Sequence, residues 1–451
     1  MVEMSDEQRR RWDIDKAIDQ LRALATQYTQ YENYDLGYHP IMFSSQAFRT
    51  FYAEVMRRYR LNLCRPIVDS IAERLSIDTW EGNDGVQSWW LERGLNLQNR
   101  LHRQTIRSGD GYVLVWPQQT MQGELRAHRI VSSEATVVYS DENETPEYGI
   151  KLWQHEVSRD RWVQRMNVYY LDHVERYIRE GTEQVSYAQG SSFRWYEGDD
   201  AGPVIDYDGP LREQGQDGFL PLVHFAATPD LTPFGTSALE DVIPIQDALN
   251  KHAIDLLVSS ESLALPLRAL LGFEVIEGPD GKPTNLPEYD PRMDYLLTVP
   301  GEATKLVQLP SGDLSQLMAA KESAVDEMAA VAGIHQSRLR SVDAVPSGEA
   351  LRVVERPLVS QVRNLQQDFS ASWAQVARLL GHDGNPTWED PTEMDITEVW
   401  TLVQQKLDAG WPARQAYIEA GLEPEFVDEV LADAQGTTDL LQQNLDTGIL
   451  L

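Results

Sequence analysis

The sequence predicts an α+β protein in which helical and strand-rich segments occupy separate parts of the chain. Three observations support this fold class. Apolar residues recur every three or four positions over long stretches, as in amphipathic helices. Between residues 110 and 227 that spacing gives way to short β-branched and aromatic runs separated by turn residues. The 451 residues are 42% hydrophobic, which is enough for a large core and fits two to four domains.

The N-terminal part of the chain is predicted to be helical. Segments 6–32, 46–60, 65–75 and 86–108 each carry apolar residues at helical spacing, so each has one apolar face. Pro66 suits the first turn of the third segment, because a helix makes no use of the N–H there.

An antiparallel sheet is predicted for residues 110–227. The runs there are rich in Val, Tyr and Trp, which favour strands, and turn residues separate them. The expected strands are 112–116, 126–131, 135–139, 148–155, 162–170, 175–179 and 219–225.

Two long helices are predicted further on, with a Pro- and Gly-rich module between them. The first covers 237–263, and Pro244 should bend or delay its first turns. The second covers 313–332 and ends at Gly333. The intervening segment, about 266–310, should contain short strands at 273–276 and 295–299.

The longest predicted helix covers 347–380 and follows a loop at 334–346. Ser347 is its expected N-cap, and Gly381 is its expected end. Pro357 lies inside the helix and predicts a kink, because it removes a backbone hydrogen bond and collides with the preceding turn. Short helices should follow at 395–408, 412–420, 424–433 and 437–447.

The charge balance is strongly acidic. Lys and Arg number 39 against 71 Asp and Glu, which gives a net charge of −32. A surface that grips DNA phosphates should be basic, so a conventional DNA-binding protein is excluded. Two interpretations remain open: an acidic surface past which DNA slides without sticking, or acidity that serves solubility.

Cysteine content and hydropathy narrow the class of protein. Cys64 is the single cysteine, which excludes an internal disulfide and a cysteine metal cage and fits a reducing cytosol. No run approaches the ~18 apolar residues of a membrane helix. The N-terminal residues lack the apolar core of a signal peptide. We therefore expect a soluble protein without membrane partners.

Motifs for catalysis are weak. The Gly-Lys pair within GPDGKP at 278–283 lacks the spacing of a phosphate-binding loop. His155 and Glu156 are not followed by the second His of a zinc protease, and no nucleophile elbow occurs. The sequence therefore predicts no catalytic residue, no metal site and no cofactor.

The arrangement of the long helices is more informative. Two helices of similar length flank a compact module, and a loop then leads into a very long helix. This pattern is typical of a stalk with a small domain at its tip. It is also compatible with an ordinary helical hairpin in a mixed domain.

Several short segments occur in a characteristic order and spacing over about residues 30–380. They are NYDLGYHP at 33–40, NLCRPIVD at 62–69, GDGYVLVW at 109–116, PFGTS at 233–237, IQDALNK at 245–251 with Glu261 and Pro266 further on, and PSGEAL at 346–351. In the order and spacing of these segments, the sequence resembles the portal proteins of long-tailed phages.

The resemblance implies a portal fold in named parts. They are a mixed α/β wing at 1–236, a first stem helix at 237–264, a small α/β clip at 265–311, a second stem helix at 312–333, a tunnel loop at 334–346, a long kinked wing helix at 347–392 and a helical crown at 393–451.

The resemblance also implies a function. Such subunits form a ring, expected to be dodecameric, at the capsid vertex of the virion, and double-stranded DNA passes through it without sequence specificity during packaging and ejection. The clip would dock the large terminase subunit and later the head-completion or connector protein. Other expected partners are the major capsid and scaffold proteins. The portal would hydrolyse nothing, and it would be made in the host cytoplasm.

Four acids of the first stem helix are candidates for the channel wall, where they would repel DNA phosphates and lower sliding friction. The alternative is that they lie on an outer, solvated face. They are Asp241, Asp247, Asp255 and Glu261.

Arg338 and Arg340 of the tunnel loop are candidates for transient contact with the DNA backbone. The alternative is that they pair with acids of the neighbouring subunit. The kink at Pro357 would let the long helix bend beneath this loop.

Two other classes of protein compete with the portal. An acidic hydrolase would need convergent titratable residues, and the sequence nominates none. A different capsid or scaffold protein would be more helical and less rich in Trp and Tyr. The helix–module–helix arrangement favours the portal.

Overall fold

The computed structural model shows an α+β chain with mainly antiparallel strands, as predicted. It divides into two compact units, Met1–Val345 with Val354–Glu389, and Pro346–Val353 with Asp390–Leu451. The structure describes residues 5–40, 46, 50, 61–82, 84–117, 125–159, 161–181, 186–198, 202–206, 220–264, 268–271, 279, 296–299, 305–308, 314–341, 348–392, 403–419, 427–428 and 431.

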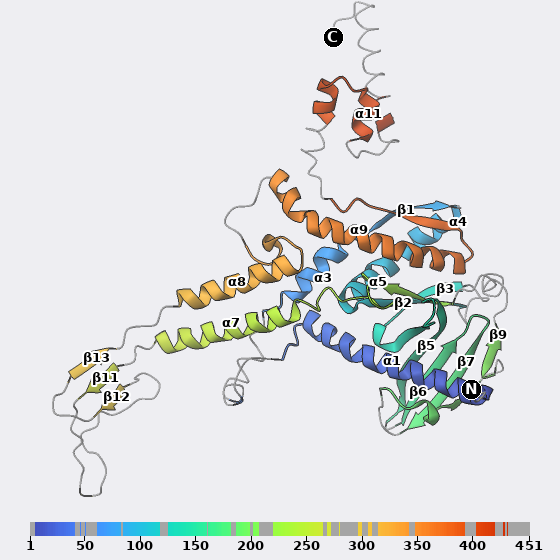
Figure 1. Cartoon of the computed structure of the whole chain (residues 1–451), viewed down its shortest axis with the longest axis horizontal. Helices are drawn as coiled ribbons and strands as arrows, with labels where there is room; N and C mark the ends of the chain where they lie inside the picture. Colours follow the sequence, from blue (N-terminus) through green and yellow to red (C-terminus); the bar gives the residue numbers. More distant parts are fainter. Residues whose placement is uncertain are drawn as a thin grey trace, which may run out of the picture. The chain divides into compact units, whose positions relative to one another are not determined.

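In the first unit, helix α1 (Asp6–Asp35) lies against a six-stranded sheet (Figure 1). Ser5 caps α1 by accepting a hydrogen bond from the Gln8 backbone N–H. The apolar face predicted for this helix packs on the sheet through Ile14, Ile18 and Leu21. The sheet has the order β4-β5-β6-β7-β8, and β9 also pairs with β7. Its strands are β4 (Ala135–Tyr139), β5 (Pro146–Ser158), β6 (Arg161–Tyr169), β7 (His173–Gly181), β8 (Arg194–Trp195) and β9 (Val204–Asp206).

A second sheet has the order β10-β2-β3, so the predicted strands are antiparallel but divided between two sheets. Its strands are β2 (Asp110–Pro117), β3 (Leu125–Ile130) and β10 (Leu222–Ala226). Helices α3 (Cys64–Ala72) and α5 (Leu95–Ser108) contribute buried residues to the main hydrophobic core, which also contains the buried residues of this sheet. A two-stranded sheet pairs β1 (Ile77–Gly82) with β14 (Gly384–Trp388).

The single helix predicted over 86–108 is wrong in one detail. It is divided into α4 (Asp84–Trp89), a π-helical turn at Trp90–Gly94 and α5. Trp90 is fully buried, and a Cβ placed on Gly94 would lie 2.1 Å from its ring. The π turn, a form that occurs mostly as a single turn inside α-helices, thus places a large indole against a residue without a side chain.

Helix α7 (Ile243–Ala264) and helix α8 (Ser315–Val331) lie side by side (Figure 1). Helix α7 begins six residues after the predicted start, because Pro244 suits only the first turn of a helix and the preceding residues form turns. Between the two helices the chain contributes a small sheet of β11 (Arg268–Leu271), β12 (Leu296–Val299) and β13 (Lys305–Gln308). The central strand β11 pairs parallel with β12 and antiparallel with β13.

The predicted strand at 295–299 is confirmed as β12, whereas β11 and β13 were not predicted. The predicted strand at 273–276 lies outside the described residues. So does the predicted helix at 46–60, except for residues 46 and 50, which are helical.

Helix α9 (Gly348–Leu379) supplies one wall of the main core. Its apolar stripe is buried at the predicted spacing: Leu358, Val362, Leu365, Phe369, Trp373 and Val376. The helix is continuous through Pro357, so the proline does not break it. The predicted cap, Ser347, lies outside the described residues.

In the second unit, residues 403–408 and α11 (Ala413–Ile418) are helical, as predicted. Arg414 Nε lies 2.6 Å from a carboxylate oxygen of Asp428, and Lys406 Nζ lies 3.4 Å from one of Glu419. The predicted helix at 424–433 is described only at three helical residues, 427, 428 and 431. The predicted helix at 437–447 lies outside the described residues.

Candidate functional site: the α7–α8 hairpin and the segment after it

The start of α7 is anchored in the body of the first unit by a buried carboxylate. The Tyr34 hydroxyl donates a hydrogen bond to Asp247 Oδ1 at 2.7 Å. Burial raises the pKa of the Asp247 carboxyl, and the bond from Tyr34 opposes that rise. Asp247 is only 6% exposed. The prediction that it lines a channel is therefore revised, because its carboxylate is turned toward α1 and away from solvent.

Two amides of α7 hold the chain on either side of residues 41–60. Gln246 accepts from the Leu63 N–H at 2.9 Å and donates to the Leu61 carbonyl at 2.6 Å. One turn later, the Asn250 side chain lies 2.9 Å from His39 Nδ1. Because His39 Nε2 faces a carbonyl at 2.9 Å, Nε2 carries the proton and Nδ1 accepts from the Asn250 amide. Hydrogen bonds with a defined donor and a defined acceptor therefore fix the start of α7 to the chain on both sides of residues 41–60.

Replacing Tyr34 with Phe is expected to lower the free energy of unfolding by about 1–3 kcal/mol, because a buried carboxylate loses a donor without becoming exposed. Denaturant unfolding of the variant and the wild type would measure the change. Tyr38→Phe is the matched control, since its ring is 62% exposed, and a change within about 0.5 kcal/mol is expected there. Equal effects of the two substitutions would contradict the assigned role of Tyr34.

The other three candidate acids of the first stem helix do not share the buried environment of Asp247 in the described part of the structure. Asp241 is exposed and lies in the turns that precede α7. Asp255 forms an ion pair with Lys251 one turn earlier on the same helix. Glu261 belongs to α7, but its side chain is outside the described part of the structure. The four candidates therefore occupy different environments along the helix.

The described part of the predicted tunnel loop, residues 334–341, is short and structured. A 3₁₀ turn, η4 (Gln336–Arg338), begins after His335, whose buried ring accepts from the Ser337 N–H. Arg340 lies 3.1 Å from a carboxylate oxygen of Asp326 on α8 and 3.9 Å from one of Glu322. Arg340 therefore pairs with acids of its own chain. The partners expected from the sequence were the DNA backbone or acids of a neighbouring subunit.

The end of α8 meets α9 beside Pro357. Gly333 has a φ of +68° and closes α8 in the left-handed conformation that glycine adopts readily. A Cβ placed on Gly333 would lie 3.6 Å from Cβ of Pro357. Two residues before Pro357, Glu355 forms a buried ion pair with Arg74, in the turn after α3. Pro357 thus lies close to the end of α8 and to this ion pair, and its kink stays a prediction.

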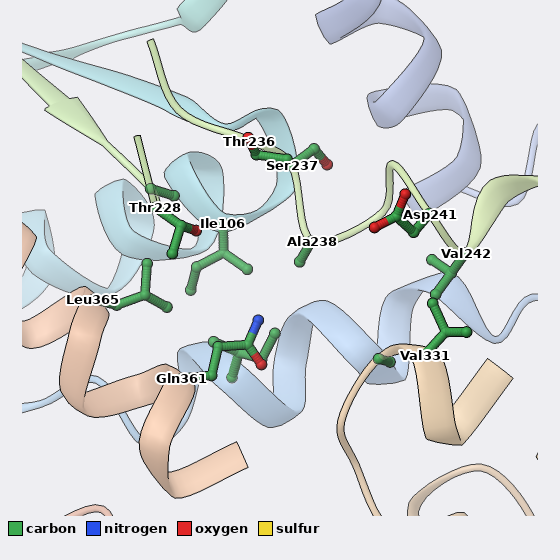
Figure 2. A pocket seen from close by; sticks show the side chains of 13 residues that line it. Ile106, Thr228, Thr236, Ser237, Ala238, Asp241, Val242, Val331, Gln361 and Leu365 are labelled. Carbon is green, nitrogen blue, oxygen red and sulfur yellow. The ribbon is translucent and has the colours of Figure 1, made fainter. Parts of the chain in front are cut away.

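A cavity of about 160 Å³ opens at the root of the hairpin (Figure 2). Its wall combines the turns before α7, the end of α8 and the middle of α9. The residues that define it include Asp241, Val242, Val331, Gln361 and Leu365. Among the described residues that line it, Asp241 is the titratable one.

The sequence did not predict a buried polar network that holds the chain just before α7. Asp110 of β2 accepts hydrogen bonds from the Tyr28 hydroxyl at 2.7 Å, from the Gly235 N–H at 2.8 Å and from His224 Nε2 at 2.8 Å. The other ring nitrogen of His224 accepts from the Tyr139 hydroxyl at 2.8 Å. The Gly-Asp-Gly motif at 109–111 was noted, but it gave no sign of these distant partners.

An Asp–His pair can belong to a hydrolase. In this pair, both carboxylate oxygens of Asp110 and both ring nitrogens of His224 form hydrogen bonds within the network. Among the described residues, no Ser, Thr or Cys side chain bonds the His224 ring; Ser372 donates instead to the His224 backbone oxygen. Because Asp110 also bonds the Gly235 N–H, the network fixes the turn that leads into α7. We assign it a positioning role at the base of the hairpin.

The described residues contain no group of three or more His, Cys, Asp or Glu side chains that could hold a metal ion. Among the same residues, no helix is long and apolar enough to span a membrane.

The architecture defines a chain whose long helical hairpin carries an inserted sheet and is fixed at its base to a mixed α/β body. A family model described as phage portal protein, SPP1 Gp6-like, matches residues 14–411. The chain therefore belongs to this family of phage portal proteins.

Three solved structures are similar to the chain, with TM-scores of 0.43–0.44. "Neck of native GTA particle computed with C12 symmetry" shares 15% identity and covers 85% of this chain and 95% of its own. "Virion of native gene transfer agent (GTA) particle" shares 16% identity, with 86% and 96% covered. "Neck of empty GTA particle computed with C6 symmetry" shares 15% identity, again with 86% and 96% covered. No curated protein matches the sequence.

Proposed function

We propose that the chain is the subunit of a dodecameric ring at the capsid vertex, through which double-stranded DNA enters and leaves. The observation that carries this proposal is the α7–α8 hairpin with its inserted sheet, within a chain that the portal family model matches over residues 14–411. A hairpin fixed at one end by Gln246, Asp247 and Asn250 is a suitable wall element for a channel.

The parts of the ring subunit follow the boundaries stated for the sequence. We assign the wing to 1–236, the stem helices to 237–264 and 312–333, the tunnel loop to 334–346, the long wing helix to 347–392 and the crown to 393–451. The clip at 265–311 would dock the large terminase subunit and then the connector protein. Its three short strands, β11 to β13, support a small separate module there.

The proposed ring works without catalysis and resides in the virion after synthesis in the host cytoplasm. The root cavity offers one titratable side chain, and the buried Asp110–His224 pair is occupied by structural partners. Major capsid and scaffold proteins would surround the ring, and no cofactor takes part.

The channel surface is proposed to be acidic, with Asp241, Asp255 and Glu261 as candidates after the revision of Asp247. A net charge of −32 per subunit repels phosphates, and this repulsion prevents DNA from adhering while it moves. Arg338 and Arg340 are the cations proposed to contact DNA, and Arg340 also pairs with Asp326 of α8.

The experiment that tests the ring uses the purified full-length chain. Native mass measurement should give about twelve times the subunit mass of 51.2 kDa, and negative-stain images should show a ring with a central hole. A compact monomer that hydrolyses a substrate would support the hydrolase, and an assembly without a hole would support a scaffold. Either result would overturn the proposal.

Replacing Arg338 with Ala is expected to reduce the length of DNA that packaged capsids retain, because a cation that contacts phosphate is lost. Gel analysis of DNA from purified capsids would measure the change. Arg159→Ala, in the exposed turn between β5 and β6, is the matched control. DNA of equal length and retention in both variants would remove Arg338 from the channel.

A further inference from the structure

A cluster of arginines stands out on this acidic chain. Arg100, Arg103 and Arg107 of α5 are three, four and seven residues apart, so they share one helix face. Arg129 joins them from β3, an edge strand of its sheet. The Arg129 side chain donates to the neutral amide oxygen of Gln104, on the same face of α5.

Only part of this cluster is neutralised. Arg103 is held by Asp35 at 2.9 Å and by Asp69 at 2.8 Å. Arg107 lies 3.6 Å from Asp35 and from Glu32. In the described part of the chain, Arg100 and Arg129 form no ion pair, and Arg100 is exposed.

The unpaired arginines repel one another. Burial lowers the pKa of Arg129, and the charges of Arg100 and Arg107 lower it further, while Glu134 and Glu32 oppose this in part. The Nε atoms of Arg107 and Arg129 are buried and have no hydrogen-bond partner among the described residues. A carboxylate brought to the exposed Arg100 beside Arg129 would relieve this repulsion.

We propose that the surface formed by Arg100 and Arg129 binds an acidic turn of a second copy of this chain, and that this contact closes the ring. The inference rests on the proposed function and identifies a contact that holds neighbouring subunits of the ring together. The occupant is the turn between β4 and β5, which carries Asp141, Glu142 and Glu144.

The turn is suited to this role by exposure and rigidity. The Asp141 side chain is 94% exposed, and its nearest cation, Lys16, is 3.9 Å away. The Glu144 N–H donates to the Ser140 carbonyl at 3.0 Å, and the Ser140 N–H donates to the Thr145 carbonyl at 2.8 Å. A turn that is already ordered loses little conformational entropy on binding.

The occupant must come from another copy, because strand β4 separates the two surfaces within one chain. Glu134, which precedes β4, is close enough to act on the charge of Arg129, whereas the acidic turn follows the strand's other end. Five strand residues span about 16 Å at about 3.3 Å each. A basic surface that meets a different, acidic surface of an identical chain is a head-to-tail contact, and such contacts generate rings.

A protein partner is favoured over nucleic acid at this surface. Glu32, Asp35 and Asp69 neutralise Arg103 and Arg107, so the attraction is confined to Arg100 and Arg129 and suits the few carboxylates of one turn better than a continuous DNA backbone. Subunits of charge −32 also repel one another, so a ring of them needs a local attraction of opposite charges.

The experiment is a charge exchange in the full-length chain. R100E/R129E should abolish the ring mass and leave monomers, and E142K/E144K should do the same through residues that are fully solvent-facing. The four substitutions together should restore the ring. Circular dichroism spectra equal to that of the wild type establish that the variants are folded, and E142K/E144K keeps the test valid if R100E/R129E fails to fold.

The outcomes separate this inference from the proposed function. A wild type that forms no ring overturns the proposed function. A wild-type ring with either double variant still assembling overturns only the present inference, as does a four-fold variant that stays monomeric. Assembled R100E/R129E rings with weakened, salt-dependent binding of a short DNA duplex would assign the surface to nucleic acid and overturn the inference too.

Discussion

Replacing Arg74 with Ala is expected to lower the free energy of unfolding by about 3–5 kcal/mol, because it leaves the Glu355 carboxylate buried without its cation. Arg74, in the turn after α3, donates from one guanidinium nitrogen to both carboxylate oxygens of Glu355 on α9, each at 3.1 Å. The two side chains are only 6% and 9% exposed. Denaturant unfolding at neutral pH and matched protein concentration would measure the loss, since assembly itself adds stability.

Two further variants isolate the ion pair. Arg356→Ala removes the exposed arginine that directly follows Glu355 on α9, and it should change the free energy of unfolding by less than about 0.5 kcal/mol. Arg74→Met with Glu355→Leu should recover most of the loss, because no unpaired charge remains. A single Arg74 variant as stable as the Arg356 variant would contradict the argument.

The ion pair has a consequence for the proposed ring. Glu355 lies two residues before Pro357, which borders the end of α8. The pair therefore fixes α9 at the point where the α8 hairpin arm returns to the body. A portal subunit that must keep its channel wall in place during DNA passage needs such a fixed point.

The sequence predicted those elements whose signal is local. Long helices with an apolar stripe, such as α1 and α9, repeat the same pattern over many turns, so their type and face were predicted correctly. Strands β4 to β7 were predicted because their turns and their β-branched residues coincide. The family was predicted from motifs spread along the chain, and the family model confirms it.

Features that depend on distant partners escaped prediction. Asp247 is interleaved with other acids on α7, and only Tyr34, 213 residues away in the chain, shows that it points inward. The π turn at Trp90 depends on burial of one indole in the assembled core. Strands β11 and β13 lie in a Pro- and Gly-rich segment and hold fewer β-branched residues than β12, so they gave no clear strand signal.

The histidine at the centre of the main core illustrates how tertiary contacts determine protonation. The Trp373 indole N–H donates to His102 Nε2 at 2.8 Å, and an indole can only donate. His102 Nδ1 faces the Leu75 carbonyl at 2.9 Å, and a carbonyl can only accept. His102 is therefore neutral, with its proton on Nδ1, and burial lowers its pKa to about 4.

Acidification from pH 6.5 to 4 is consequently expected to cost about 3 kcal/mol of stability through His102 alone. Above the unfolded-state pKa of about 6.5, the His102 imidazole is neutral in both the folded and the unfolded chain, and the full free energy of unfolding is present. As the pH falls, the unfolded chain binds a proton that the folded chain cannot, at about 1.4 kcal/mol per pH unit. In His102→Gln this part of the pH dependence should disappear, whatever the variant's stability at pH 7.

The measurement is the difference in the slope of unfolding free energy against pH between the wild type and each variant. Using a difference removes the contribution of the many carboxylates that titrate in the same range. His155→Gln, in an exposed position of β5, is the matched control and should keep the wild-type slope. If His102→Gln also keeps that slope, the ring can accept a proton inside the folded core, and the Trp373–His102–Leu75 chain of hydrogen bonds does not hold it neutral.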